Sequence, residues 1–251
     1  MTNKQASPPP SGSSAPTHLS EAALRFLRGL ARHNDRTWFE ERRAVYETEL
    51  KRPMLAIVAG VTDAMTGFAP DHVRPPEKIL MRIYRDTRFA VDKRPYKTHA
   101  SAWWTRRGLE KTSGAGFYFH VSGKEVQIAA GVYMPEAAQL LAIRRYLLEH
   151  HAAFRSLVGG RPMRKLYQPD TGNPLTRAPK GFPKDHPADD LVRQRQWGVH
   201  ASLPAEVVCD PAFAATLVRY FAMAAPLVAL LNAPLVNQLP NDAKVRRKPL
   251  F

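Results

Sequence analysis

The chain has 251 residues, with 37 lysines and arginines against 22 aspartates and glutamates, so its formal net charge is +15. Hydrophobic residues make up 44% of the sequence, which suffices for a core and excludes low-complexity disorder for most of the chain. The one cysteine, Cys209, excludes an intramolecular disulfide and multi-cysteine zinc sites, and it fits a reducing, cytoplasmic compartment.

Both ends of the chain differ in composition from the rest. Residues 1–17 contain no apolar run and no arginine, which excludes a secretory signal and a mitochondrial transit peptide and predicts a disordered tail. Residues 241–251 form a basic tail, a pattern that is usually a solvated charge run. We expect a single domain over residues 18–240 between them.

The first third of the chain has the apolar spacing of helices. Ser20 and Asp35 can each cap one, because their side chains accept a free backbone N–H at a helix start. Pro53 is expected to end or kink the second helix. The predicted helices run from Ser20 to Asn34, from Asp35 to Pro53, and on to about Met65, before a loop rich in Pro and Gly over 67–76.

The pattern then changes to the alternation of strands, with aromatic and β-branched residues. Ser122-Gly123 predicts a turn, so residues 116–133 should form a hairpin. Of the neighbours Trp103 and Trp104, one should pack into the core while the other could offer an aromatic platform. The predicted strands are 79–84, 100–105, 116–121, 125–133 and 197–203.

The last part of the chain is again helical. Pro135 opens a helix that should end at His150-His151, and residues 159–186 read as a long irregular connection. A short helix should follow Pro187, another should start at Asp210, and a last one should follow Pro226. The whole pattern predicts an α+β fold, with a central, mostly antiparallel sheet flanked by N-terminal and C-terminal helices.

One segment needs comparison with a membrane span. The stretch from Tyr220 to Leu239 carries no charge and is long enough to cross a bilayer. Pro226 and Pro234 interrupt it, so buried core helices explain it better. We therefore expect no membrane partner.

The densest local chemistry lies between residues 82 and 99, which hold six basic residues and two acids. Arginine offers a planar fork of donors that suits phosphate or carboxylate, so this cassette predicts an anion-binding pocket. The alternative is a structural ion-pair network in which the two aspartates hold the arginines. The predicted anion-binding residues are Arg82, Arg85, Arg88, Lys93, Tyr96, Lys97 and Thr98, with Asp86 and Asp92 in support.

A second basic cluster lies in the long connection. Lys180 and Lys184 are predicted to join the anion site, with Asp185 in support. His186 is a candidate acid or base, because a neighbouring aspartate can fix its tautomer, although the pair could equally precede and cap the next helix. No phosphate-binding loop, dinucleotide fingerprint or spaced set of metal ligands is present in the sequence, so we expect no metal and no cofactor.

Several motifs together resemble the domain of unknown function 2461 family. They are Phe26-Leu-x-x-Leu with Asn34-Asp-Arg-x-Trp-Phe39, Arg82-Ile-Tyr-Arg-Asp-Thr-Arg-Phe89, Asp92-Lys-Arg-Pro-Tyr-Lys97, Gly131-x-Tyr133 with Pro135, Leu141-Ala-Ile-Arg144, and Lys180-Gly-Phe-x-Lys-Asp-His-Pro187. The resemblance covers about residues 19–237, with Arg94 as a departure, since the family more usually has a small or polar residue there. Because these bacterial and fungal proteins are uncharacterised, the resemblance implies a shared α+β fold and a shared surface, and no activity.

Three functions are therefore open. The first is the binding of a phosphorylated or carboxylated small molecule, with or without its chemical processing. The second is nucleic-acid binding through the basic surface, which should weaken steeply with salt. The third is a protein-interaction module in which the cassette at 82–99 is structural.

Overall fold

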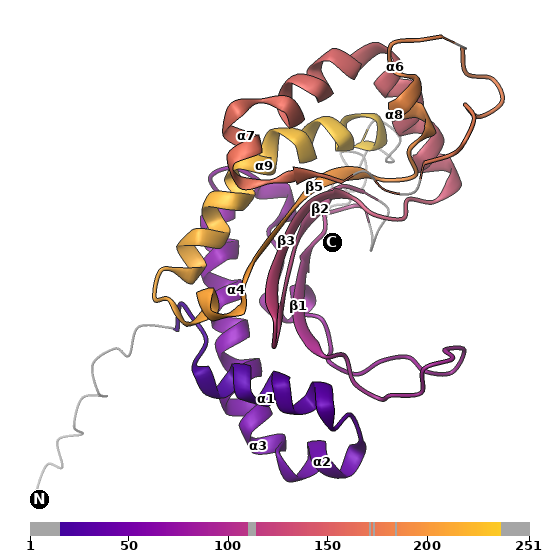
Figure 1. Cartoon of the computed structure of the whole chain (residues 1–251). Helices are drawn as coiled ribbons and strands as arrows, with labels where there is room; N and C mark the ends of the chain where they lie inside the picture. The colour runs from indigo at the N-terminus through magenta and orange to yellow at the C-terminus, as the bar shows by residue number, and fades with distance from the viewer. Residues whose placement is uncertain (1–15, 110–113, 171, 173, 184, 237–251) are drawn as a thin grey trace, which may run out of the picture.

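The computed structural model describes residues 16–109, 114–170, 172, 174–183 and 185–236 (Figure 1). Its helices are α1 (Glu21–Arg32), α2 (Arg36–Glu41), α3 (Arg43–Val45), α4 (Arg52–Met65), α5 (Pro76–Ile79), α6 (Ala137–Gly159), α7 (Arg161–Leu166), α8 (Asp189–Arg193) and α9 (Phe213–Val236), with a π-helical segment at Tyr46–Lys51 and 3₁₀ turns at Pro70–His72 and Ala205–Cys209. Its strands are β1 (His99–Trp104), β2 (Gly116–Ser122), β3 (Glu125–Val132), β4 (Gln168–Pro169) and β5 (Trp197–Pro204). The expected tails lie outside the described residues, apart from Pro16 and Thr17.

The strands form one sheet in the order β1-β2-β3-β5-β4, and every neighbouring pair is antiparallel. The predicted hairpin is confirmed, because β2 pairs with β3 from Gly116 opposite Gly131 to Val121 opposite Val126. Four of the five predicted strands are confirmed to within two residues, as β1, β2, β3 and β5. The predicted α+β class, with a central antiparallel sheet and helices from both ends of the chain, is therefore confirmed.

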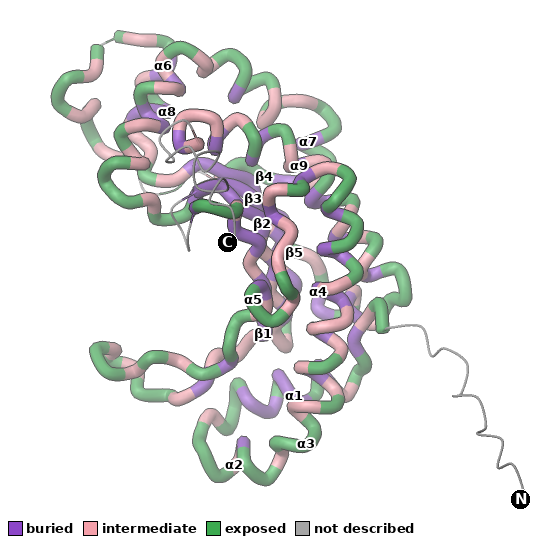
Figure 2. The backbone as a smooth tube through the Cα atoms, turned by 180° about the vertical axis from the view of Figure 1, so that it is seen from behind, coloured by how far each residue is buried: buried purple, intermediate pink, exposed green. Residues whose placement is uncertain are grey.

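One face of the sheet packs against helices. α9 contacts β2, β3 and β5 and lies beside α4 (Figure 1). Alternate strand residues such as Trp104, Phe119 and Ile128 are fully buried on this face. The Trp104 indole donates to Thr62 Oγ1 in α4 at 2.8 Å, and its ring lies 5.2 Å from that of Phe221 in α9. Buried residues accordingly concentrate in the strands and on the inner sides of these helices (Figure 2).

The predicted helix caps are confirmed at both positions. Ser20 Oγ accepts the backbone N–H of Ala23 at 3.3 Å, and Asp35 Oδ1 accepts that of Trp38 at 2.9 Å. Of the two expectations for Pro53, the end of the helix is wrong, because helical backbone continues into α4, whereas an irregularity is present as the π-helical segment directly before the proline. The backbone N–H of Arg52 donates to the carbonyl oxygen of Glu47, five residues earlier, instead of to the residue four earlier as in an α-helix. Pro53 therefore follows a π-helical turn.

The predicted strand at 79–84 is wrong. Its first residue ends α5, and the chain then forms a two-stranded projection that we call the arm (residues 80–97). Single bridges join Leu80 to Ala102 of β1 and Tyr84 to Tyr96 across the arm. The apolar and polar residues of 79–84 do alternate, but the alternation reflects an arm with one packed face and not a strand of the central sheet.

Two predictions for the C-terminal helices are also wrong. α9 is one helix with Pro226 and Pro234 inside it, where two helices were expected. The connection expected to be irregular contains α7 and β4. The helix end predicted at His150-His151 coincides with a kink in α6, where the backbone of His150 is non-helical before a second helical stretch runs on to Gly159. Among the described helices, α9 alone has the length and apolar composition of a membrane span, yet it packs on the sheet, α4 and α6.

Candidate functional site

The face of the sheet opposite α4 and α9 is hollowed into a groove of about 830 Å³. Successive side chains on a strand point to opposite faces, so the residues that line the groove alternate with those buried under the helices. The loop before β1 and the root of the arm supply one wall. The polar and aromatic side chains from the strands are His99 and Trp103 of β1, Tyr118 and His120 of β2, Gln127 of β3 and His200 of β5.

Three glycines form part of the groove floor. Gly116, Gly131 and Gly198 are paired side by side across β2, β3 and β5. Gly131 has φ +144°, and a Cβ there would lie 2.2 Å from the carbonyl oxygen of Trp197. A side chain is therefore excluded at Gly131, and this end of the groove presents bare backbone.

Three cations line the groove: Arg74, which bonds Thr105 just after β1, Lys78 in α5, and Lys97 at the root of the arm before β1. None of them forms an ion pair within the described part of the chain. Burial lowers the pKa of Lys97, and the nearby Arg82 guanidinium lowers it further. The groove also contains Asp170, whose carboxylate accepts the Gln196 amide at 2.9 Å. The groove therefore carries positive charge that no ion pair among the described residues neutralises.

Two imidazoles and a phenol lie together on the floor. The rings of His99 and His120 are 4.7 Å apart, and the Tyr118 hydroxyl lies 3.1 Å from His120 Nδ1. Burial lowers the pKa of His99 to about 4 and also lowers that of His120, whereas burial raises the pKa of the Tyr118 hydroxyl. Both imidazoles are thus neutral at physiological pH, and each offers one hydrogen-bond donor and one acceptor.

The tryptophan pair divides as the sequence predicts, with Trp104 in the core and Trp103 in the groove. Trp103 Nε1 is buried and has no hydrogen-bond partner among the described residues. It lies 3.4 Å from the position that a Cβ on Gly116 would occupy, which places it at the row of glycines. An unpaired buried donor is costly, so a ligand acceptor at this place would satisfy it.

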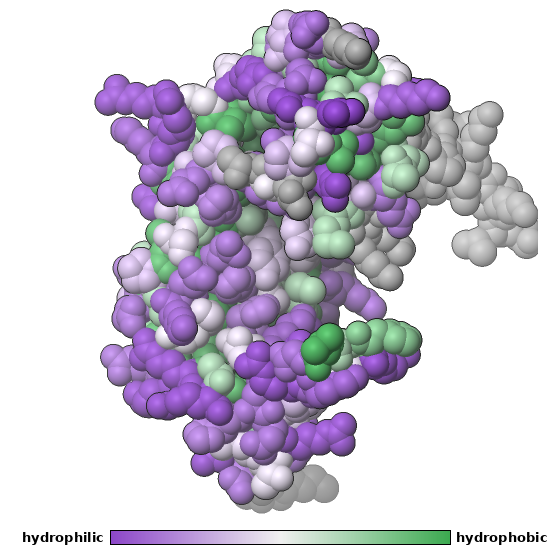
Figure 3. Space-filling view, turned by 45° about the vertical axis from the view of Figure 1, so that its right-hand side comes forward, coloured by the Kyte–Doolittle hydropathy of each residue, from purple (hydrophilic) through white to green (hydrophobic). Residues whose placement is uncertain are grey.

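Most of the predicted anion-binding residues lie on the arm, whose tip forms a green apolar projection in Figure 3. There Arg85 and Arg94 both pair with Asp92, at 2.8 Å each, and Arg88 pairs with Asp86 at 2.7 Å. These pairs form the ion-pair network that the alternative interpretation describes. An anion at this place would have to displace the aspartates.

The other predicted residues of the cassette have separate environments. Lys93 donates to the carbonyl oxygen of Thr87 at 3.1 Å, and Arg82 is exposed. Tyr96 is buried and stacks on Phe39, whereas Thr98 is half-buried. Only Lys97 of this set lines the groove.

The second cluster lies apart from the groove lining. Lys180, Asp185 and His186 are not among the described residues that line it, and Lys184 falls outside the described residues. His186 Nδ1 accepts the N–H of Ala188 at 3.1 Å, just before α8, and its ring lies 5.7 Å from that of His151. This contact resembles the predicted capping arrangement more than a catalytic pair, and the acid–base role of His186 stays a prediction.

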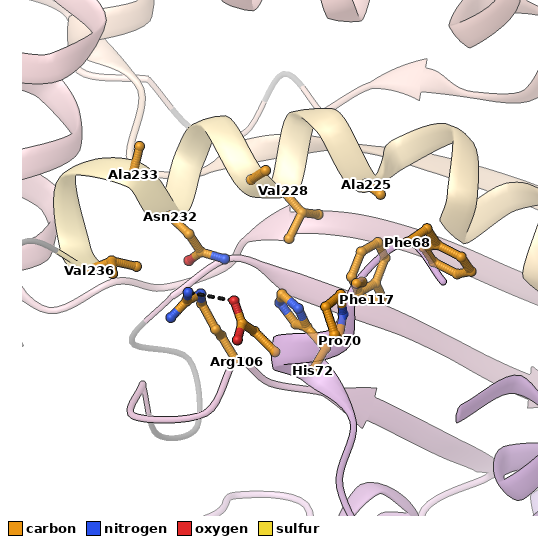
Figure 4. A pocket seen from close by; sticks show the side chains of 13 residues that line it. Phe68, Pro70, His72, Arg106, Phe117, Ala225, Val228, Asn232, Ala233 and Val236 are labelled. Atoms are coloured by element: carbon orange, nitrogen blue, oxygen red, sulfur yellow. Dashed lines mark hydrogen bonds and ion pairs between the residues drawn. The ribbon is translucent and has the colours of Figure 1, made fainter. Parts of the chain in front are cut away.

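A smaller cavity of about 370 Å³ lies between α9 and the loop that contains His72 (Figure 4). His72 is 5% exposed, and its Nε2 lies 3.2 Å from the carbonyl oxygen of Ala115. Arg106 pairs with Asp71 at 2.6 Å on the same side. Burial lowers the pKa of His72 to about 4. The His72 imidazole is therefore neutral in the folded protein at physiological pH.

This environment predicts a loss of stability on acidification. The pKa of His72 is about 4 in the folded protein, below the 6.5 of an exposed histidine, so the unfolded chain binds the proton first as the pH falls. Between pH 7.5 and pH 5 the loss attributable to His72 is about 2 kcal/mol. Urea unfolding of the wild type and of His72→Gln, whose amide still reaches Ala115, should show a steeper pH dependence for the wild type. Equal slopes would contradict the prediction.

A family model for conserved hypothetical proteins, DUF2461, matches residues 22–229. The chain belongs to this family. No curated protein and no solved structure matches the chain. The match confirms the resemblance seen in the motifs, and it attaches no reaction to any residue. Within the described part of the chain, no three histidine, cysteine or acidic side chains lie together in a way that could hold a metal ion.

Sequence reasoning missed most of the groove. Arg74 comes from the predicted loop and Lys78 lies just before the predicted strand at 79–84, and neither was assigned to a site. His99 was expected as a cationic donor at the end of the cassette, whereas its lowered pKa makes it a neutral side chain of the groove. A usable signal was present: on β1 and β2, polar and aromatic residues alternate with fully buried ones. That alternation indicates a sheet face without a covering helix.

Proposed function

We propose that the protein binds a small organic anion, carrying a phosphate or a carboxylate, in the groove on the uncovered face of the sheet. The observation that supports this most is the set of three cations that line a partly apolar groove and have no carboxylate partner among the described residues. The positive charge of Arg74, Lys78 and Lys97 would attract the anionic group into the groove. The glycine row and Trp103 would contact the organic part, and we place this activity in the cytoplasm.

The anion site proposed here lies in the groove, whereas the sequence suggested a site in the cassette at 82–99. On the arm, the guanidinium groups of Arg85, Arg88 and Arg94 are occupied by aspartates, so anion binding there would first cost those pairs. In the groove, Lys78 and Lys97 have no such competitor among the described residues. The neutral His99 and His120 on the groove floor add donors that carry no charge of their own to neutralise.

The experiment is thermal unfolding with phosphate, sulfate, nucleotides, sugar phosphates, dicarboxylates and short oligonucleotides. A ligand at about a hundred times its dissociation constant adds roughly 2.7 kcal/mol, which raises Tm by about 5–10 °C for a chain of this size. We expect Lys78→Met/Lys97→Met to lower the affinity at least tenfold, and Lys165→Met, which removes one charge from α7, to leave it unchanged.

Three outcomes would contradict the proposal. One is the absence of any shift across the panel. Another is an equal shift in the wild type and in Lys78→Met/Lys97→Met. The third is a shift that survives this double variant but is lost in Arg88→Ala, because it would place the anion site on the arm. A shift confined to oligonucleotides, and fading steeply with salt, would instead favour a nucleic-acid ligand.

A further inference from the structure

The arm is fixed rigidly at its root. The side chain of Asn34 bonds both backbone polar groups of Tyr96: its Nδ2 donates to the Tyr96 carbonyl and its Oδ1 accepts the Tyr96 N–H, each at 3.0 Å. The Tyr96 ring stacks on Phe39 with centroids 4.1 Å apart, and Tyr84 packs against both rings. The direction in which the arm projects is therefore set by the helical part of the fold.

The two sides of the arm are also held together along their length. The N–H of Arg85 donates to Pro95 O at 2.9 Å, and the Arg85 guanidinium pairs with Asp92 across the arm at 2.8 Å. Nearer the tip, Lys93 reaches back to the carbonyl oxygen of Thr87 at 3.1 Å. The Arg85–Asp92 ion pair therefore has a structural role that needs no ligand. Together with the hydrogen bonds it holds the two sides of the arm together, so that the tip projects away from the body of the protein (Figure 3).

The tip itself is apolar and uncovered. Phe89 and Val91 expose 95% and 101% of their reference areas, and they flank Ala90. Arginines and lysines follow directly behind them, so that residues 85–94 hold four cations against two aspartates, a net charge of +2. An exposed apolar tip with a cationic collar has the chemistry to contact a surface that is apolar next to anionic groups.

The size and chemistry of the tip decide among the possible contacts. Two side chains bury far less than the roughly 800 Å² per partner of a stable protein interface. The forks of Arg88 and Arg94 are bound by aspartates through both Nε and Nη2, so they are not free to read base edges, and only the net charge of +2 is left to attract an anionic surface. A bilayer surface needs no matched partner surface, since it accepts aromatic side chains at the headgroup level and attracts net positive charge.

We propose that the tip of the arm, Phe89-Ala-Val91, inserts into the headgroup region of a bilayer that contains anionic lipids. The contact is peripheral and reversible, because only two large side chains enter the interface. It is independent of the groove, and it departs from the expectation of no membrane partner, which rested on the absence of a spanning segment. The cations behind the tip would face the headgroups.

The test is co-sedimentation of the full chain with vesicles of 70% phosphatidylcholine and 30% phosphatidylserine. Removing both apolar side chains in Phe89→Ser/Val91→Ser should weaken binding by about tenfold for each side chain. Pure phosphatidylcholine vesicles should bind the wild type roughly 30-fold more weakly, because two net charges lose their attraction. Met134→Ser, which removes an exposed side chain outside the arm, serves as the matched control and should bind like the wild type.

A second measurement places the tip directly. In Phe89→Trp, the new indole should be quenched by brominated lipids in the same vesicles. Equal vesicle binding by the wild type and the double serine variant, or an unquenched indole, would overturn the proposal. So would oligonucleotide binding that depends on the tip while vesicles do not bind. The double serine variant should keep any Tm shift that a small anion produces, so a failure here is separable from a failure of the groove.

Discussion

Replacing Gly131 with alanine is expected to lower the free energy of unfolding by about 3–5 kcal/mol, enough to threaten the fold. Gly131 has φ +144°, a conformation that residues with a side chain rarely adopt. A Cβ would also lie 2.2 Å from the carbonyl oxygen of Trp197 and 2.5 Å from the Cα of Gly198. Both obstacles are backbone atoms of β5, so relief requires the central strands to separate.

Gly60 offers the matched control for this experiment. It lies in α4, and a Cβ there would meet nothing within 4 Å. Gly60→Ala should stabilise the protein by about 0.4–1 kcal/mol, because alanine loses less backbone freedom in a helix. Urea unfolding followed by circular dichroism measures both variants. A Gly131→Ala protein as stable as the wild type would contradict the close backbone approach of β3 and β5 at Gly131.

Replacing Asn232 with alanine is the second large effect, with an expected loss of about 2–4 kcal/mol. Asn232 is 2% exposed, and its side chain holds the backbone of Ala115: Oδ1 accepts the N–H at 2.9 Å and Nδ2 donates to the C=O at 3.0 Å. The Ala115 carbonyl keeps His72 as a partner, but its N–H is left buried without one. This contact joins α9 to the chain just before β2.

Asn34 makes the same pair of contacts in a more open place, which gives an internal comparison. It holds the N–H and C=O of Tyr96, but these bonds are only partly buried. Water can replace the lost partners there, so Asn34→Ala should cost about 1 kcal/mol. Urea unfolding of the two alanine variants separates burial from hydrogen-bond number. Equal losses would show that burial of the Ala115 backbone does not set the cost.

The local features of this fold could be read from the sequence. Ser20 and Asp35 start helices because a cap depends on a few neighbouring residues. The strands around Trp104, Phe119 and Ile128 could be located because their alternation depends only on which residues are apolar. Even the division of Trp103 from Trp104 followed from this period of two.

The errors share a physical cause. Pro53, Pro226 and Pro234 break helices as isolated residues, yet here a π-helical segment and the packing of α9 accommodate them. The alternation at 79–84 carried no information on its partners, which turned out to be β1 at Leu80 and the other side of the arm at Tyr84. Propensity is local, and tertiary packing overrides it when enough apolar surface is buried in return.

The sequence by itself therefore determined the α+β class, the family, the helix starts, the central hairpin and the excess of positive charge. Only the tertiary structure decided where that charge is free. It paired Arg85, Arg88 and Arg94 with Asp86 and Asp92, placed Lys97 beside His99 and Arg74 beside Thr105 in the groove, and left Phe89 exposed at the tip of the arm. The reason is that register and exposure depend on segments far apart in the chain, whereas composition and periodicity record only what each segment carries.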